Sequence, residues 1–281
     1  MTKQSQSLPE YELYAIRYAH LAARRKDLFA HGDPHDGPMD VDYFIWVAVG
    51  EERSFVVDIG FSQATGDKRN RKLLRCPIDS LRLIGLDPNE IQDVVITHLH
   101  YDHAGNFKLL PAAKFHIQEP EMNFAAGRHM RNAFFRGAYE VEDIVDVVRL
   151  NYAERVFFYS GRVDLAPGIT LEPMPGHTPG QQMVRVHTKR GWVVLLSDAA
   201  HYFENILSCR PFSAVLNMPE MVDSFDRILT LAGGVDRMIP GHDPLVMQMY
   251  PDASPELEGV VVRLDEEPDM SVLPAQFASS K

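Results

Sequence analysis

The chain has 281 residues, and 45% of them are hydrophobic, so it can bury a sizeable core in one large domain or two small ones. Its 39 acidic and 28 basic residues give a formal net charge of -11, which opposes binding to a polyanion such as a nucleic acid. Residues 1–10 lack the basic start and apolar run of a secretory signal, and no stretch approaches the roughly 20 apolar residues of a membrane span. We therefore expect a cytoplasmic protein that binds neither nucleic acid nor a membrane.

Apolar runs predict strands along most of the chain. The runs 43–49 and 54–58 are joined by a polar turn and predict a hairpin. A short run of buried-strand type at 94–97 ends directly in a group of histidines and acids. The spacing of apolar residues then becomes helical over 120–151. Further strands are predicted at 155–159, 170–174, 183–187, 192–196 and 238–239.

The pattern indicates one domain with two related halves. The apolar runs that end before His98 and Asp198 each deliver a ligand-type residue at the carboxyl end of a strand, which predicts two β/α halves that face one cleft. The sequence contains no linker rich in Pro, Gly or Ser, so we expect a single domain over 1–281, with an N-terminal extension at 1–39 and a loosely structured tail at 256–281. The apolar residues of the extension would cover either this domain or a neighbouring copy, which leaves a homo-oligomer open.

The densest chemical signal is the motif His-x-His-x-Asp-His. It places His98, His100, Asp102 and His103 within six positions. Residues two apart in an extended chain point to the same side, so His98 and His100 are able to bind one ion. The turn that follows directs Asp102 and His103 toward a second ion.

Three further ligand-type residues lie in turns or at strand ends downstream. His177 and His242 are flanked by Gly and Pro, which fix a loop rigidly, and Asp198 follows an apolar run. Five histidines and two aspartates form a nitrogen and oxygen ligand set that suits divalent first-row ions. We expect two ions per chain and favour zinc, with manganese, iron or cobalt as alternatives.

Together these motifs resemble those of the metallo-β-lactamase superfamily, over roughly 43–244, and within it those of the N-acyl-homoserine-lactonase group. The resemblance implies an α/β fold, a four-layer αββα sandwich with both metals in one cleft. It also implies that Asp58 braces the metal loop, whereas a plain turn acid at a strand end is the alternative. The implied ligands are His98, His100 and His177 for the first metal, Asp102, His103 and His242 for the second, and Asp198 as the bridge.

The resemblance implies a dinuclear hydrolase that opens the ester of a small lactone by attack of a metal-bound hydroxide. Asp102 would move a proton as the intermediate collapses. These lactonases commonly carry a Tyr three residues after the bridging Asp, whereas this chain has His201 there and Tyr202 next, and either side chain would contact the carbonyl. The departure puts acyl-homoserine lactones in doubt. Hydrolysis of a cyclic amide, acyclic ester or thioester, and a non-catalytic metal-loaded binding protein, are the alternatives.

Two other features have competing interpretations. The aromatic and apolar residues of the helical segment favour a core position, and the alternative is a pocket for an acyl chain or ring. The basic run 68–72, with Arg75, favours a solvated helix face, and the alternative is contact with an anionic substrate. The helical set is Met122, Phe124, Phe134, Phe135 and Tyr139.

Overall fold

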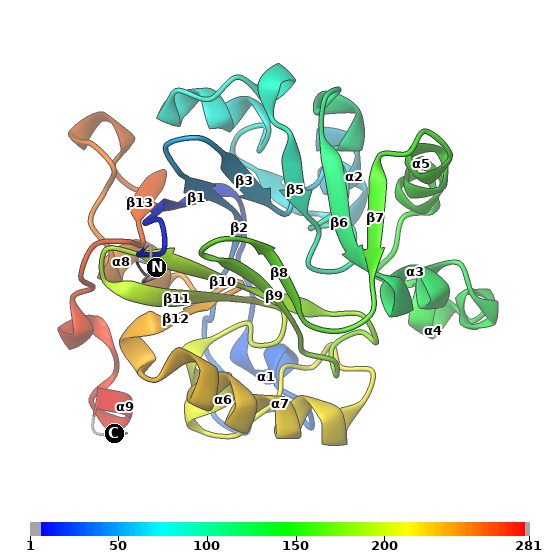
Figure 1. Cartoon of the computed structure of the whole chain (residues 1–281). Helices are drawn as coiled ribbons and strands as arrows, with labels where there is room; N and C mark the ends of the chain where they lie inside the picture. Colours follow the sequence, from blue (N-terminus) through cyan, green and yellow to red (C-terminus); the bar gives the residue numbers. More distant parts are fainter. Residues whose placement is uncertain (1–6, 279–281) are drawn as a thin grey trace, which may run out of the picture.

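The computed structural model describes residues 7–278 of the chain. In this part, the strands form two sheets that pack face to face, and helices cover the outer faces of both (Figure 1). Helices α2 (Gln63–Arg69) and α5 (Val141–Tyr152) lie outside the first sheet, whereas α6 (Phe203–Leu207) and α7 (Met218–Ala232) lie outside the second. The predicted αββα sandwich is confirmed.

The first sheet has the strand order β13-β1-β2-β3-β5-β6-β7, and β4 pairs with β1. Strands β3, β5, β6 and β7 run parallel, so their carboxyl ends lie at one edge of the sheet. The residues that follow β3 and β5 therefore emerge close together. The bounds are β1 (Glu12–Leu21), β2 (Val41–Val49), β3 (Ser54–Val57), β4 (Lys72–Leu73), β5 (Asp93–Val95), β6 (Lys114–Gln118), β7 (Val156–Tyr159) and β13 (Val261–Arg263).

The second sheet has the order β12-β11-β10-β9-β8. Strands β11 and β12 run parallel, so the segments that follow them also emerge at one edge. The two sheets thus deliver loops from both halves of the chain to a shared edge of the sandwich. The bounds are β8 (Val163–Ala166), β9 (Ile169–Pro173), β10 (Gln182–Thr188), β11 (Gly191–Ser197) and β12 (Met238–Pro240).

Strand β2 shows how the sequence specifies the layers. Its side chains alternate between the two faces of the first sheet. Phe44 and Trp46 belong to the core shared with the second sheet, whereas Ile45 and Val47 belong to the core under the outer helices. Because both faces are buried, the strand is a continuous apolar run from Tyr43 to Val49.

The structure corrects the predicted N-terminal extension and tail. Strand β1 lies inside the first sheet, between β2 and β13, and most of its residues are buried. Strand β13 pairs with it in register, from Tyr14 opposite Arg263 to Ile16 opposite Val261. The two ends of the chain therefore complete the first sheet, and local patterns missed this because the pairing joins segments that are distant in sequence.

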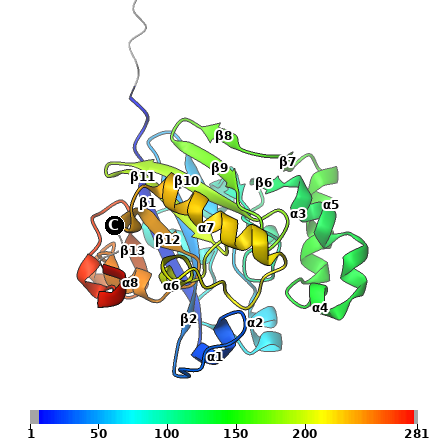
Figure 2. The same cartoon turned by 90° about the horizontal axis from the view of Figure 1, so that it is seen from below.

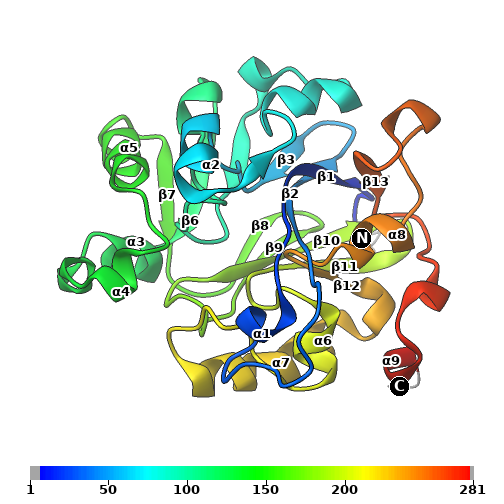
Figure 3. The ribbon, with the colours of Figure 1, turned by 180° about the vertical axis from the view of Figure 1, so that it is seen from behind.

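The segment between β1 and β2 extends across to the side of the second sheet. It contains α1 (Arg25–Leu28), which lies on the side of α6 and α7 in Figure 3 but apart from α7 in Figure 2, and Arg25 Nη1 donates to the Glu204 carboxylate of α6 at 2.8 Å. Phe29 forms a bridge with Phe212, and the Arg210 guanidinium lies 2.8 Å from the Asp33 carboxylate. This segment therefore covers the chain's own domain.

The remaining helices are short. The predicted helical stretch 120–151 contains α3 (Glu119–Ala125), α4 (Ala133–Arg136) and α5, separated by turns. Helices α8 (Leu245–Met249) and α9 (Ala275–Ala278) lie near the C-terminus. Within the described residues, no helix combines the length and the apolar character needed to cross a membrane.

Candidate metal centre

The histidine-rich loop begins where β5 ends and is braced by Asp58, which follows β3. The backbone N–H of Thr97 donates to Asp58 Oδ1 at 2.7 Å, and the Thr97 hydroxyl donates to Asp58 Oδ2 at 2.8 Å. The Nδ1 atom of His103 lies 2.7 Å from the same Oδ2 atom. One buried carboxylate therefore ties both ends of the loop to the neighbouring strand, which is the bracing predicted for Asp58.

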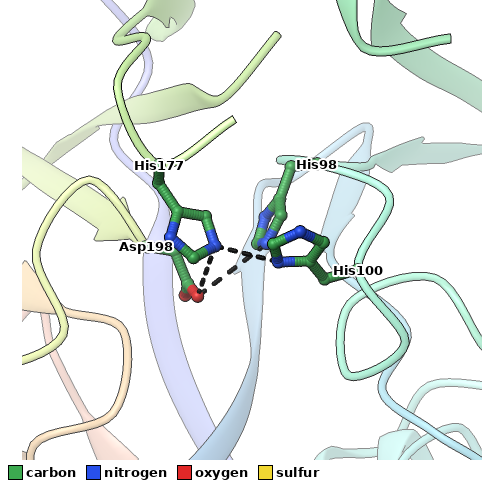
Figure 4. Close-up of side chains that lie close together, drawn as sticks. All are labelled: His98, His100, His177 and Asp198. Carbon is green, nitrogen blue, oxygen red and sulfur yellow. Dashed lines mark hydrogen bonds and ion pairs between the residues drawn. The ribbon is translucent and has the colours of Figure 1, made fainter. Parts of the chain in front are cut away.

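Four side chains from three segments form the first group (Figure 4). His98 and His100 come from the loop after β5, His177 from the turn between β9 and β10, and Asp198 from the end of β11. His177 Nε2 lies 2.9 Å from His100 Nδ1 and 3.2 Å from Asp198 Oδ2. His98 Nε2 lies 3.8 Å from that Oδ2 atom. One ligand-type atom from each residue falls within 4.8 Å of the others.

The second group consists of Asp102, His103 and His242. The Nε2 atoms of His103 and His242 lie 3.7 and 3.8 Å from Asp102 Oδ2. The same two nitrogens lie 3.2 and 3.0 Å from Asp198 Oδ1. The two oxygens of Asp198 thus face different groups, so this carboxylate joins them.

The hydrogen bonds around the rings turn ligand-type atoms toward the cluster. His177 Nδ1 lies 2.7 Å from the Ala214 carbonyl, and His242 Nδ1 lies 2.9 Å from the Asp42 carbonyl, so each Nδ1 is held by the backbone and each Nε2 faces the Asp198 carboxylate. His98 Nε2 and His103 Nε2 are buried and have no hydrogen-bond partner among the described residues. Buried polar atoms are rarely left unpartnered, and a cation would satisfy these nitrogens. The residues therefore fit two divalent ions.

The electrostatics of the cluster favour neutral rings on the first side. Burial lowers the pKa of His98 and His100 well below the usual value, and it lowers the pKa of His177 to about 4. Burial also lowers the pKa of His103, but the carboxylate of Asp198 and its acidic neighbours outweigh this and leave the pKa well above its usual value. A neutral imidazole is the form that binds a metal, so the first group is ready for an ion at neutral pH.

The structure places His201 at the cluster and Tyr202 away from it. His201 is buried, its Nε2 lies 3.0 Å from Asp198 Oδ2, and its ring stacks on Phe212 at 3.6 Å between centroids. The Tyr202 hydroxyl donates to the Asp40 carbonyl at 3.0 Å, and its side chain lines a different cavity. Of the two candidates for contact with a carbonyl, only His201 therefore lies beside the histidine groups.

Two cavities meet at this cluster. The larger, of about 500 Å³, is lined by predicted ligands and by Tyr43 and Tyr101, which sequence reasoning did not assign to the site. Arg71 also lines it, and for the basic run of this residue contact with an anionic substrate was the alternative interpretation. Tyr101 lies inside the ligand motif, so its position alone was a signal. The other two come from β2 and from the segment after α2, and only the fold shows that they face the cluster. The ligand-type residues along the larger cavity are His100, Asp102, His177, Asp198, His201 and His242.

The smaller cavity, of about 230 Å³, is aromatic. Phe124, Phe134, Phe135 and Tyr139 line it, together with His100 and His177. Phe134 is 80% exposed, so the favoured core interpretation is wrong for this residue. The alternative interpretation, a pocket wall beside the metal centre, fits the structure.

Glu121 is a positioning residue that the sequence analysis missed. Its buried carboxylate accepts hydrogen bonds from the Leu99 backbone N–H at 3.0 Å and from the Thr178 hydroxyl at 2.6 Å. It also accepts from the Gly180 N–H at 3.0 Å and from the Tyr139 hydroxyl at 3.2 Å. It therefore ties the loop of His98 and His100 to the turn of His177. Helix α3 also contains Glu119, so the local sequence did not single out Glu121.

The αββα fold brings two groups of histidine and aspartate side chains together at one cleft, and each group has the composition of a metal-binding site. The sequence model of the metallo-beta-lactamase superfamily matches residues 40–242, and the chain belongs to this superfamily. The N-acyl homoserine lactonase of Bacillus cereus is 31% identical over 134 residues, which is 47% of this chain and 48% of that one. The N-acyl homoserine lactonase AttM of Azorhizobium caulinodans is 26% identical over 183 residues, 59% of this chain and 64% of that one. The chain spans about half the length of the first of these relatives.

Solved structures show the same fold. An N-acyl homoserine lactone hydrolase with the product N-hexanoyl-L-homoserine bound at its catalytic metal centre aligns with a TM-score of 0.72 and 20% identity, over 86% of this chain and 96% of that one. AidC, a dizinc quorum-quenching lactonase, aligns with a TM-score of 0.64 and 18% identity, over 86% and 90%. These likenesses confirm the sandwich.

Proposed function

We propose that the chain is a dinuclear metal-dependent hydrolase that opens the ester of a small lactone. The observation that carries this proposal is the Asp198 carboxylate, whose Oδ2 faces His177 at 3.2 Å while its Oδ1 faces His242 at 3.0 Å. A carboxylate shared between two histidine groups is what a bridged pair of ions requires. The names of the N-acyl homoserine lactonases that resemble the chain also support a lactone substrate.

The proposed roles follow from position. His98, His100 and His177 would hold one ion, Asp102, His103 and His242 would hold the other, and Asp198 would be shared between them. When bound, divalent ions, with zinc favoured, would supply Lewis acidity that acidifies a water and polarises a carbonyl. Proton transfer and contact with the scissile carbonyl are carried out by side chains of the protein.

Two side chains at the cavity act on the reacting ester. Asp102 lines the larger cavity and is placed to carry a proton to the ring oxygen as the ester C–O bond breaks. His201 lines the same cavity, and its ring is held by Phe212 and by the bond to Asp198, so it is positioned to contact the scissile carbonyl. Tyr202 has no corresponding role, because its hydroxyl is bound to Asp40.

The aromatic cavity supplies binding for an apolar part of the substrate. Its walls come from α3 and α4, and it touches the metal groups at His100 and His177. A lactone with an apolar substituent would place that substituent against Phe124 and Phe135, where burial of apolar area stabilises the complex.

The test is a pH-indicator hydrolysis assay of the purified, metal-analysed protein against lactones, with thioesters, cyclic amides and acyclic esters in parallel. We expect turnover of lactones that is lost on chelation and restored by zinc. Faster turnover of one of the other classes would move the substrate assignment to that class. Two bound ions without hydrolysis of any compound would contradict the proposal and favour a metal-loaded binding protein.

A further inference from the structure

The structure separates the members of the basic run 68–72. Lys68 and Arg69 both pair with Glu140, at 2.6 and 2.7 Å. Lys72 is exposed and does not line either cavity at the cluster. Arg71 alone of these residues lines the larger cavity beside the predicted ligands. The solvated-face interpretation therefore fails for Arg71.

Arg71 is held in place by neutral partners. Asn70, in a left-handed conformation, ends α2, and the Arg71 N–H then donates to the Gly66 carbonyl at 2.9 Å. In the side chain, Nε donates to the Tyr101 hydroxyl at 3.1 Å, and Nη1 donates to the Arg69 carbonyl at 2.9 Å. These bonds fix the plane of the guanidinium group without neutralising its charge.

No carboxylate within residues 7–278 lies within 4.0 Å of the Arg71 guanidinium. This distinguishes it from Arg24, which lines the same cavity but pairs with Asp36 at 2.6 Å. Asp27 also lines the cavity, and its side chain is exposed and does not approach Arg71 to 4.0 Å. Arg71 is therefore a half-buried cation without a counter-charge in the protein.

A partly buried, unpaired charge costs free energy that an anionic ligand offsets. Burial lowers the pKa of Arg71, but the neighbouring phenols of Tyr43 and Tyr101 outweigh burial and leave the pKa above its usual value, so the group stays charged. Tyr43 also packs edge-on against the His242 ring at 5.1 Å between centroids. Tyr43 is thus a neighbour of both the Arg71 guanidinium and the second metal group.

We propose that Arg71, oriented by Tyr101, is a binding subsite for a carboxylate carried by the substrate, so that the preferred substrate is an anionic lactone. This inference rests on the proposed lactone hydrolysis. A carboxylate is the group assigned because the planar guanidinium fork matches its two oxygens. Arg71 contacts the substrate at a distance from the reacting ester, and it determines specificity without taking part in the chemistry.

The probes are matched pairs of γ-butyrolactones. In each pair one lactone carries a carboxylate, on the ring or at the end of a two- or four-carbon tail, and the other carries the neutral carboxamide at the same position. The values of kcat/KM are compared within each pair. The corresponding cyclopentanones, which carry no ester, are used for calorimetric binding to the zinc-loaded protein.

The variants are Arg71→Gln, which removes the charge, and Arg71→Lys, which keeps the charge and loses the fork. Lys72→Gln is the matched control, because it removes one positive charge from the adjacent, exposed position. Thermal unfolding of each variant establishes whether it is folded. If Arg71→Gln does not fold, the comparison is made with Arg71→Lys.

The wild type is expected to prefer the carboxylate member of at least one pair, and Arg71→Gln is expected to reduce that preference by on the order of 10- to 100-fold. Arg71→Lys should retain part of the preference for the carboxylate, and Lys72→Gln should retain all of it. The kcat/KM values for the carboxamide members should change little in every variant. An equal loss of kcat/KM for the carboxylate and carboxamide members in Arg71→Gln would overturn the proposed subsite. The absence of any preference for the carboxylate in the wild type would also overturn it. Binding of the carboxylate cyclopentanone that depends on Arg71, without hydrolysis of any lactone, would instead retain the subsite and reject the proposed function.

Discussion

Strand β5 has a buried pair of aspartate and histidine at each end, and the two pairs differ. At its start, Asp93 binds Arg53 Nε at 2.7 Å and His116 Nε2 at 3.0 Å, and His116 Nδ1 binds the Tyr159 hydroxyl at 2.9 Å. Both ring nitrogens of this histidine are occupied. Beyond its end, Asp58 binds His103 Nδ1 at 2.7 Å, while the other ring nitrogen of His103 has no hydrogen-bond partner among the described residues.

The difference separates a structural histidine from one prepared for a ligand. A buried polar network stabilises a fold when each member is satisfied, as it is around His116. The loop after β5 instead leaves the Nε2 atoms of His98 and His103 open toward other ligand-type groups. Both histidines are buried, so the open nitrogen atom is the structural feature that distinguishes His103 from His116.

The largest effect is expected from Asp198→Asn, because the amide removes the charge that joins the two groups. Loss of several kcal/mol of transition-state stabilisation corresponds to a decrease in kcat/KM on the order of 1000-fold or more. Steady-state lactone hydrolysis and elemental analysis of the same sample measure the effect. Wild-type turnover in this variant would show that the bridge is not needed.

The next largest effect on turnover is expected from substitution of His201, and substitution of its neighbour Tyr202 is the comparison. His201→Ala removes the side chain at the cavity, and we expect kcat/KM to fall on the order of 100-fold, the size reported for loss of one donor to a developing oxyanion. Tyr202→Phe removes a hydroxyl that binds Asp40, so it should lower the free energy of unfolding by about 1 kcal/mol and leave kcat unchanged within a few-fold. The reverse order of the two kinetic effects would assign the carbonyl contact to Tyr202.

Asp58→Asn opens the bracing network without replacing a proposed ligand. Loss of the acceptor for His103 Nδ1 should weaken metal affinity by roughly 10- to 100-fold, the usual effect of removing a partner that orients a ligating histidine. Competition with a chromogenic chelator measures that affinity. Asp93→Asn is the matched control at the other end of β5, and an equal loss of metal affinity in both variants would remove the distinction between the two pairs.

The smallest effect on function is expected from Asp93→Asn itself. Burial raises the pKa of Asp93, but hydrogen bonds from His116 and Arg53 outweigh burial and lower it to about 2. A lowered carboxyl pKa stabilises the fold above the unfolded-state pKa of roughly 4, and the contribution is lost as the pH falls toward 2. The variant should therefore lose on the order of 1 to 2 kcal/mol at pH 7 and show a flatter decline of stability below pH 4 in urea unfolding. A decline as steep as that of the wild type would contradict the assignment.

The apolar pattern predicted most of the strands, because buried runs such as that of β2 are evident from this pattern alone, whereas the sandwich was implied by the resemblance of the motifs. The sequence also predicted the seven ligand-type residues that the structure brings into two groups. Four were evident from their spacing in one motif, and three from their positions in turns or at a strand end. Strand β1 was missed as part of the sheet because its partners lie elsewhere in the sequence. The different directions of His201 and Tyr202, and the exposure of Arg71 to the cavity, depend on the packing of distant segments. No local pattern reports them.

The central claim is that Asp198 joins two metal sites that together open a lactone. The most direct test is elemental analysis of the zinc-reconstituted protein, with lactone turnover recorded in the same samples as zinc is added stepwise. We predict two ions per chain at saturation and turnover that rises as the second ion binds. Saturation at one ion with full turnover, or two ions with no lactone hydrolysis, would contradict the account.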